Sequence, residues 1–324
     1  MKVHPIILLL GLGMVCTFGI NIPLSTTTAV RFADERRAAT ELSTVDNFIK
    51  SLSPFDRAAR LQTDKAVAQD EFLKFVSAQA LPWNSEETNR LALIISSIGN
   101  KLAPFALKFP ETILLVKTTG KEEGNAAYCR NTNVIVLPQS KIPEATSKLE
   151  GLLIHELFHI LSRNNPKLRD SLYALVGYKP CSVIELPETL KSRKITNPDA
   201  PIIEHYIGVE VGGKAVLAAP VLYSSQPHYD AASGKSFFAY LTFRLLVIER
   251  EGEQWRPKHL GNRPWLLDAS ETKGFHEQIG RNTGYIIHPE EVLADNFVLL
   301  VNGKRDLPSP EIIEKMKGLL LNFP

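Results

Sequence analysis

The five residues His155-Glu156-Leu157-Phe158-His159 constrain this chain more than any other segment. In an α-helix, residues four positions apart lie on one face, so the two histidines can hold one metal ion together. The flanking residues are almost all apolar, which predicts a helix that runs through the centre of a domain. Three polar groups on one face of such a helix would be costly to bury without a shared partner. The pattern therefore favours a metal site over two structural histidines in a core.

The H-E-x-x-H pattern is typical of zinc sites in which the glutamate acts on a water molecule at the metal, so Glu156 is the expected general base. A catalytic zinc usually has three protein ligands and leaves one position open. One known continuation places a glycine and a third histidine shortly after the motif, but Ser162 and Asn165 stand at these positions. The third ligand is therefore expected from another part of the chain.

A second segment near the C-terminus supplies the best candidate for that ligand. Pro289 suits the first turn of a helix, and His288 or a neighbour could cap it. Glu291 and Asp295 would then share one face, so that Glu291 reaches the metal and Asp295 accepts the free ring N–H of a zinc-bound histidine. Glu290 is the alternative ligand, although no acid follows it four residues later. We expect one glutamate of this pair to complement the helix dipole.

Together the two motifs resemble those of the gluzincins, the thermolysin-like class of zinc metallopeptidases, which pair H-E-x-x-H with a downstream E-x-x-x-D helix. The resemblance covers two short motifs about 130 residues apart. It implies that His155, His159 and Glu291 are the zinc ligands, that Glu156 is the general base and that Asp295 holds a ligand histidine. It also implies an α+β, zincin-like fold with a mixed sheet, an active-site helix and a mostly helical C-terminal part.

Two further residues are assigned by analogy with related zinc peptidases. Tyr285, six residues before the expected third ligand, is the first choice to stabilise the oxyanion, with His288 as the second choice and a packed aromatic as the ordinary alternative. The stretch N-A-A-Y beginning at Asn125 is similar to an N-A-x-aromatic segment of thermolysin-like enzymes. Asn125 is thus a candidate to bind substrate amides, although an ordinary turn residue fits equally well.

The chain has 324 residues, of which 44% are hydrophobic and 22% charged, enough for one large domain or two small ones. Its net charge of +2 and the absence of a basic block with interleaved aromatics argue against a nucleic-acid partner. Lys2 and the apolar run over residues 6–15 predict a signal peptide or an uncleaved anchor, with Gly19 or Ala29 as cleavage positions. We therefore expect an exported protein, periplasmic or secreted, that contacts a membrane only through this segment if it is uncleaved.

The expected organisation has three parts. Residues 1–29 form the leader, 30–84 a polar helical segment and 85–324 the zincin-like domain, with an inserted β region over 201–250. Export would leave Cys129 and Cys181, which either form one disulfide or remain two buried thiols.

Individual elements are also predicted from the local pattern. Helices are expected from Ser85 to Leu102, over 167–176 and over 310–321. Strands are expected over 112–117, 133–137, 202–211, 215–223 and 237–248, and turns over 255–284. In the gluzincins an edge strand borders the cleft and pairs with the substrate backbone. We expect the strand at 133–137 to take this place.

The resemblance implies a zinc metallopeptidase that acts on a peptide or protein. The same zinc site would serve a hydrolase of a non-peptide amide or ester. A catalytically inactive zincin scaffold that only binds is the third alternative, but it predicts the loss of Glu156 or of a ligand, and neither is lost.

Overall fold

The computed structural model describes residues 21–323. Most of the predicted leader, including Gly19, lies outside the described residues. Residues 21–29 belong to the fold, because β1 (Asn21–Pro23) pairs antiparallel with β2 (Ala29–Phe32) and the side chains of Ile22 and Leu24 are buried. Cleavage after Ala29 would remove a strand and two core side chains, so the structure argues against that position.

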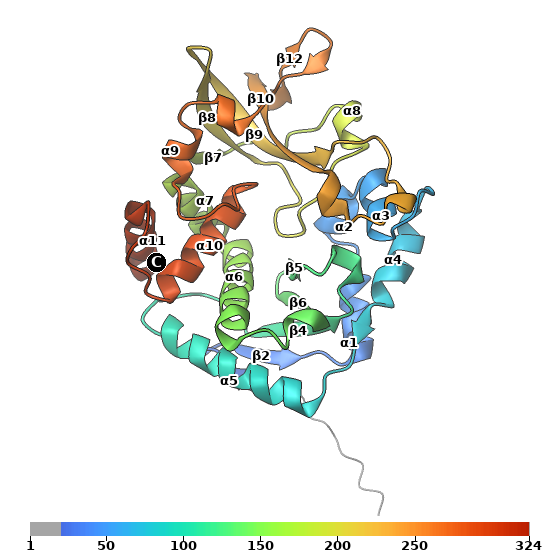
Figure 1. Cartoon of the computed structure of the whole chain (residues 1–324). Coiled ribbons are helices and arrows are strands. Elements are labelled where there is room, and N and C mark those ends of the chain that lie inside the picture. The colour runs from blue at the N-terminus through green and yellow to red at the C-terminus, as the bar shows by residue number, and fades with distance from the viewer. Residues whose placement is uncertain (1–20, 324) are drawn as a thin grey trace, which may run out of the picture.

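The first sheet is mixed and has the strand order β1-β2-β4-β6-β5. Strands β2, β4 (Thr112–Thr118) and β6 (Val134–Pro138) run parallel, and β5 (Tyr128–Arg130) pairs antiparallel with β6. The short strand β3 (Ala80–Leu81) pairs with the end of β4. The predicted strands at 112–117 and 133–137 are confirmed as β4 and β6 (Figure 1).

The expectation that the strand at 133–137 forms an edge is wrong. Strand β6 lies between β4 and β5, and β5 is the edge strand. The chain reverses between β5 and β6 at Asn131, whose φ of 51° is in the left-handed region that a tight turn requires. A three-residue strand such as β5 is too short to show alternation, which is why the sequence pattern did not reveal it.

Both faces of this sheet are buried, as its nearly continuous apolar strands suggest. Ile135 and Leu137 face a core shared with α5 (Ser85–Leu102) and α6 (Thr146–Asn164). Val134 and Val136 face a second core built with the N-terminal helices. These helices are α1 (Glu35–Leu42), α2 (Asn47–Ser51), α3 (Pro54–Arg60) and α4 (Gln69–Ser77).

Helix α5 begins and ends where the sequence predicts. Its N-cap residue, Asn84, accepts a hydrogen bond from the backbone N–H of Glu87 at 2.9 Å, and the Glu87 carboxylate accepts the N–H of Asn84 at 3.0 Å. This reciprocal pair satisfies two backbone donors that would otherwise lack partners in the first turn. Its buried face, which includes Leu91 and Ile98, packs on the first sheet.

A second, antiparallel sheet lies between the two halves of the candidate site in sequence. The predicted strands at 202–211, 215–223 and 237–248 are present as β8 (His205–Val211), β9 (Lys214–Ser224) and β10 (Leu241–Glu251). Gly212 and Gly213 have φ values of 56° and 75°, which a two-residue hairpin turn requires. Strand β10 starts later than predicted because residues Phe237–Tyr240 form the 3₁₀ helix η4.

The sheet is larger than the predicted β region. It also contains β7 (Tyr178–Pro180), β11 (Gln254–Pro257) and β14 (Leu266–Leu267), and a small separate ladder joins β12 (His259–Leu260) to β13 (Arg263–Pro264). These strands have two to four residues, too few to carry a periodic signal.

The expectation of a mostly helical C-terminal part is therefore wrong, since strands occupy much of residues 178–267. After α6 the helices are α7 (Pro166–Leu175), α8 (Glu188–Lys191), α9 (Phe275–Ile279), α10 (Pro289–Val301) and α11 (Pro310–Asn322). The helices predicted at 167–176 and 310–321 are confirmed as α7 and α11. The architecture is α+β, and none of the described helices is long and apolar enough to cross a membrane.

Candidate metal centre

The candidate site lies where α6 meets α10. Helix α6 carries the H-E-x-x-H motif and is buried along most of its second half, as predicted from its apolar residues. Helix α10 starts with Pro289 in its first turn, and the Nδ1 atom of its N-cap residue His288 accepts the backbone N–H of Glu290 at 3.1 Å. The predicted helix start is thus confirmed, and α10 lies beside α6 (Figure 1). Glu290 and Glu291 of its first turn contact the histidines of α6.

The three predicted ligands converge. The Nε2 atom of His155 lies 3.1 Å from Oε2 of Glu291, and Nε2 of His159 lies 3.7 Å from the same oxygen. One ligand atom from each of the three residues lies within 4.8 Å of the other two. His159 and Glu291 are only 1% and 2% exposed, whereas the side chain of His155 retains 14% exposure. The opening to solvent is therefore on the His155 side.

The outer nitrogen of each histidine is held by a carboxylate. Nδ1 of His155 lies 3.0 Å from Oδ1 of Asp295, as predicted, and Nδ1 of His159 lies 2.9 Å from Oε1 of Glu290. The hydroxyl of Thr283 donates to the second oxygen of Asp295. Such acceptors fix the ring orientation and the tautomer, and they direct both Nε2 atoms toward Glu291.

Glu290 also has a role that the sequence did not suggest. Its second oxygen accepts hydrogen bonds from the hydroxyls of Ser162, at 2.8 Å, and Tyr173. With both oxygens engaged, Glu290 is not among the three residues whose ligand atoms converge, and its place in the first turn of α10 agrees with the prediction that one glutamate complements the helix dipole. It is the partner of His159, matching Asp295 as the partner of His155. Because ligand histidines almost always have such an acceptor, a second one was to be expected from the motif.

The charges around the histidines favour bound cations. Burial alone would lower the pKa of His159, but the charges of Asp199 and Glu291 and the hydrogen bond to Glu290 raise it to about 9. Burial opposes ionisation of Glu291 as well, yet the two histidines and Asn197 lower its pKa to about 2. A site that stabilises protons on two imidazoles beside an ionised carboxylate also stabilises a divalent cation in their place. Two imidazoles and one carboxylate are a donor set that suits zinc.

Glu156 lies beside the histidines on the buried side of α6, with 2% exposure. The thiol of Cys129 is 3.3 Å from its Oε2 atom. Burial and the charge of Asp199 raise the pKa of Glu156 to about 7. A carboxylate with such a pKa can take up and release a proton near neutral pH, as a general base must.

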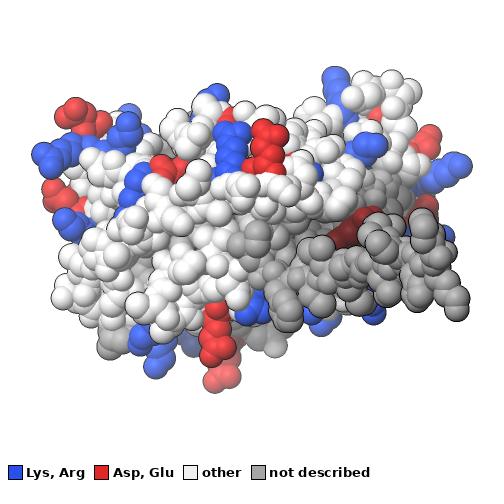
Figure 2. All heavy atoms as spheres, turned by 90° about the horizontal axis from the view of Figure 1, so that it is seen from below, with Lys and Arg blue, Asp and Glu red and all other residues white. Residues whose placement is uncertain are grey.

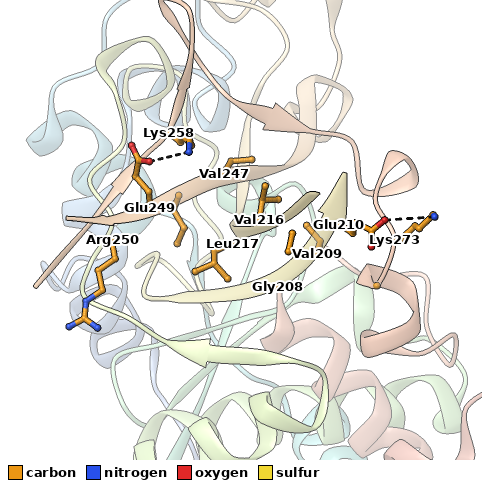
Figure 3. A pocket seen from close by; sticks show the side chains of 13 residues that line it. Gly208, Val209, Glu210, Val216, Leu217, Val247, Glu249, Arg250, Lys258 and Lys273 are labelled. Carbon is orange, nitrogen blue, oxygen red and sulfur yellow. Dashed lines mark ion pairs between the residues drawn. The ribbon is translucent and has the colours of Figure 1, made fainter. Parts of the chain in front are cut away.

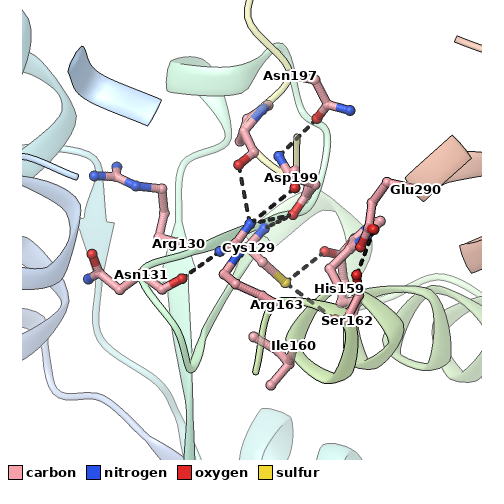
Figure 4. A network of polar contacts seen from close by, with 12 residues as sticks. Cys129, Arg130, Asn131, His159, Ile160, Ser162, Arg163, Asn197, Asp199 and Glu290 are labelled. Carbon is pink, nitrogen blue, oxygen red and sulfur yellow. Dashed lines mark hydrogen bonds and ion pairs between the residues drawn. The ribbon is translucent and has the colours of Figure 1, made fainter. Parts of the chain in front are cut away.

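Two residues of the site were not found from the sequence. The Asn197 side-chain amide donates to Oε1 of Glu291 at 2.6 Å. Asp199 accepts the backbone N–H of Cys129 at 2.9 Å (Figure 4). Asn197 and Asp199 belong to an irregular segment between α8 and β8, where hydrophobic periodicity gives no information. The N-P-D sequence at 197–199 does signal a turn, and that was the available clue.

Tyr285 lies next to the open side of the site. Its ring is nearly parallel to that of His155, with 24° between the planes and 6.3 Å between the centroids. The residue is 43% exposed, so it is not a packed core aromatic. Partial desolvation and the charge of Glu291 raise the pKa of Tyr285, which keeps the phenol protonated as a hydrogen-bond donor. His288, the second choice, packs against Tyr173 and is neutral, because burial and the charge of His205 lower its pKa to about 3.

Asn125 has a structural role in the turn before β5. It adopts a φ of 65°, its backbone N–H donates to the carbonyl of Gly120 at 2.8 Å, and its exposed side chain lies 3.5 Å from the Ser140 hydroxyl. The next two residues, Ala126 and Ala127, line a cavity of about 250 Å³ that also reaches Tyr285. Contact between Asn125 and a substrate therefore stays a prediction.

A larger cavity, of about 600 Å³, lies on the second sheet (Figure 3). Its floor is apolar, with Val209, Val216 and Leu217 among the lining residues, and ion pairs such as Glu249–Lys258 border it. No residue of the candidate metal centre lines it. Although this cavity is the larger of the two, it is separate from the metal centre and we assign it no part in the chemistry there.

Neither cysteine of the described chain is in a disulfide. Cys129 is buried in β5 and Cys181 follows β7, so both are free thiols, but only Cys129 is fully buried as the thiol alternative predicted.

On the face shown in Figure 2, basic and acidic side chains are scattered around a largely uncharged area of the described surface.

Comparison of the chain with protein-family models, with curated proteins and with solved structures gave no match. The resemblance to the gluzincins accordingly rests on two motifs and on the geometry that brings them together.

Proposed function

We propose that this protein is a zinc-dependent metallopeptidase with a gluzincin-like site on a zincin-like fold. The observation that carries the proposal is the convergence of His155, His159 and Glu291, with each histidine held from behind by its own carboxylate. Two buried structural histidines would need one partner each. They would not need a third, shared carboxylate facing both Nε2 atoms.

In this proposal His155, His159 and Glu291 hold Zn²⁺. Bound zinc would lower the pKa of a water molecule and polarise the scissile carbonyl. Glu156 accepts the proton of the attacking water and passes it to the leaving amine. The contact of Cys129 with one Glu156 oxygen fixes the carboxylate, leaving its other oxygen for this proton transfer.

Tyr285 is placed to donate its phenol hydrogen to the oxyanion that develops on the scissile carbonyl. Its position beside His155, on the exposed side of the site, supports this role. The backbone N–H of Tyr285 donates to the Thr283 hydroxyl at 2.9 Å, and that hydroxyl in turn donates to Asp295. Because Asp295 also holds His155, these hydrogen bonds connect the loop that carries Tyr285 to that histidine.

The remaining expectations belong to the same proposal. The substrate is a peptide or protein, the cofactor is zinc, and the protein is exported and reaches the periplasm or the extracellular space. Nucleic acid is not expected as a partner. A zinc hydrolase of a non-peptide amide or ester would need the same centre. An inactive binding scaffold would be expected to lose Glu156 or a ligand, and the chain has all of these residues.

The test compares two matched substitutions on α6 in zinc-loaded protein. Glu156→Gln should retain zinc and lose hydrolysis of a mixed peptide library by about 100-fold or more, since it removes the general base. Glu150→Gln, the same change on a partly exposed residue that pairs with Lys101 at 2.6 Å, should keep full activity. Undiminished hydrolysis by Glu156→Gln would refute its role. Hydrolysis of esters or acylamides but of no peptide would favour the non-peptide alternative.

A further inference from the structure

The segment over residues 195–201, called the strap below, covers the outer edge of the edge strand β5. The N–H of Cys129 points away from β6 and donates to Oδ1 of Asp199 at 2.9 Å. Arg163 of α6 donates to the carbonyls of Pro198 and Asp199 at 3.3 and 3.4 Å (Figure 4). A substrate strand added at this edge would pair with the N–H of Cys129, at the centre of β5, but that N–H is already bonded to the strap.

The strap is also anchored at its start. The backbone N–H of Thr196 donates to the Asp56 carboxylate at 3.1 Å, and Arg60 donates to the Thr196 carbonyl at 3.0 Å. The side chains of Asp56 and Arg60 have no exposed surface. Moving the strap aside would separate these buried charged groups from their partners, which is costly. An extended polypeptide therefore meets a fixed obstacle along this edge.

The space left open beside the site is small and mostly apolar. The cavity of about 250 Å³ lies between the strap, the turn before β5, η4 and the Tyr285 loop. Its size is below the roughly 300–1,000 Å³ typical of ligand pockets. Phe238 and Tyr285 line it, yet they are 45% and 43% exposed. Two exposed aromatics at one small apolar cavity indicate a binding site for an apolar group.

The cavity adjoins the proposed chemistry directly. Asn197 lines it and donates to Glu291, and Tyr285 lines it and stacks beside His155. A side chain held in this cavity would place its own backbone next to the metal centre.

We infer that the site takes short peptides, or the end of a longer chain, that present one bulky apolar side chain to this cavity, and that it does not cleave internal bonds of extended polypeptides. This inference rests on the proposed peptidase function. It follows from the blocked edge of β5 together with the size and lining of the cavity.

The experiment uses the zinc-loaded protein and two substrates. One is an acetylated, amidated tripeptide with a central phenylalanine, and the other is a long, unstructured peptide with the same three residues at its centre. We expect a kcat/KM for the tripeptide at least about tenfold above that for internal cleavage of the long peptide. We also expect a loss of about 10- to 100-fold when alanine replaces the substrate phenylalanine. Equal or faster internal cleavage of the long peptide would overturn the inference and leave the peptidase function standing.

Two variants locate the binding site. Phe238→Ala removes one wall of the cavity and should reduce the preference for phenylalanine over alanine. Leu260→Ala is the control, since Leu260 is also an exposed apolar residue, at 69%, but does not line the cavity. An unchanged preference in Phe238→Ala would contradict the assignment of the cavity.

If neither peptide is cleaved, the peptidase function fails, and the cavity is tested by binding. Calorimetry with acetyl-phenylalanine amide should then show binding that is lost with acetyl-alanine amide and weakened in Phe238→Ala. Absence of this binding would overturn the cavity assignment as well.

Discussion

Asn197 donates a 2.6 Å hydrogen bond to Oε1 of Glu291, while Oε2 of the same carboxylate faces the two histidines. The amide therefore occupies one oxygen and leaves the other for a metal. A carboxylate that binds through one oxygen uses one coordination position, which preserves the open position that catalysis needs.

Replacement of Asn197 should disturb the metal centre without unfolding the protein. For Asn197→Ala we expect zinc affinity to fall about 10- to 100-fold, as for other residues that hold metal ligands. Competition with a chromophoric chelator measures this change. Asn322→Ala, at an exposed helix end, is the control and should bind zinc normally. Unchanged affinity in Asn197→Ala would show that Glu291 needs no such partner.

Glu290 should matter for zinc binding although it is not a ligand. Glu290→Gln replaces the charged acceptor of His159 Nδ1 by an amide, so we expect zinc affinity to decrease about 10- to 100-fold. Glu311→Gln makes the same change in the first turn of α11 and should have no effect. A complete loss of zinc in Glu290→Gln together with full retention in Glu291→Gln would mean that the two glutamates have exchanged roles.

The stability of the metal-free protein should depend on pH through His159. Its pKa of about 9 lies above the ordinary value of 6.5, so its stabilising contribution is complete below pH 6.5 and is lost as the pH rises through 9. The pKa of Glu156 is also raised, from 4.5 to about 7, so its contribution to stability likewise falls as the pH rises from 4.5 to 7. Urea unfolding in the presence of a chelator should therefore show stability falling from pH 6 to pH 9. A rise over this range would contradict the assigned charges.

Zinc should reverse that trend, because metal binding requires the histidines to lose their protons. Between pH 6 and pH 9 we expect zinc affinity to increase. Calorimetric titrations in buffers of different ionisation enthalpy should show proton release on binding. Binding without proton release would be inconsistent with protonated histidines in the metal-free site.

The buried ion pairs of Arg60, which hold the start of the strap, should contribute strongly to the free energy of unfolding of the protein. Arg60 pairs with Asp56 at 2.5 Å and with Glu123 at 2.7 Å. Arg60→Met leaves both carboxylates buried without their partner, so we expect a loss of about 3–5 kcal/mol in the free energy of unfolding. Arg37→Ala breaks a surface pair with Glu41 and should cost at most about 1 kcal/mol. Similar losses in both variants would remove the basis for treating the strap as a fixed obstacle.

The sequence was sufficient where local pattern and chemistry coincide. The motif on α6 and the E-x-x-x-D spacing on α10 each place side chains on one helical face, and the resemblance to the gluzincins predicted that His155, Glu291 and Asp295 meet. The long helices and the strands of five or more residues were found for the same reason.

The sequence was insufficient where the structure depends on contacts between distant, irregular segments. The strap has no periodicity, and its position is set by Asp56, Arg163 and Glu291 from three different helices. The edge strand β5 is defined by its pairing with β6 and not by its own three residues. The helical C-terminal part was overestimated because the short strands of the second sheet become visible only through their partners in the ladder.

The most direct test of this account is the zinc content of the purified protein, measured by elemental mass spectrometry with Glu291→Ala and Glu311→Ala prepared in parallel. We predict about one zinc per chain in the wild type and in Glu311→Ala, and a sharp loss in Glu291→Ala. Absence of zinc from the wild type, even after reconstitution, would contradict the central claim and return His155 and His159 to a structural role.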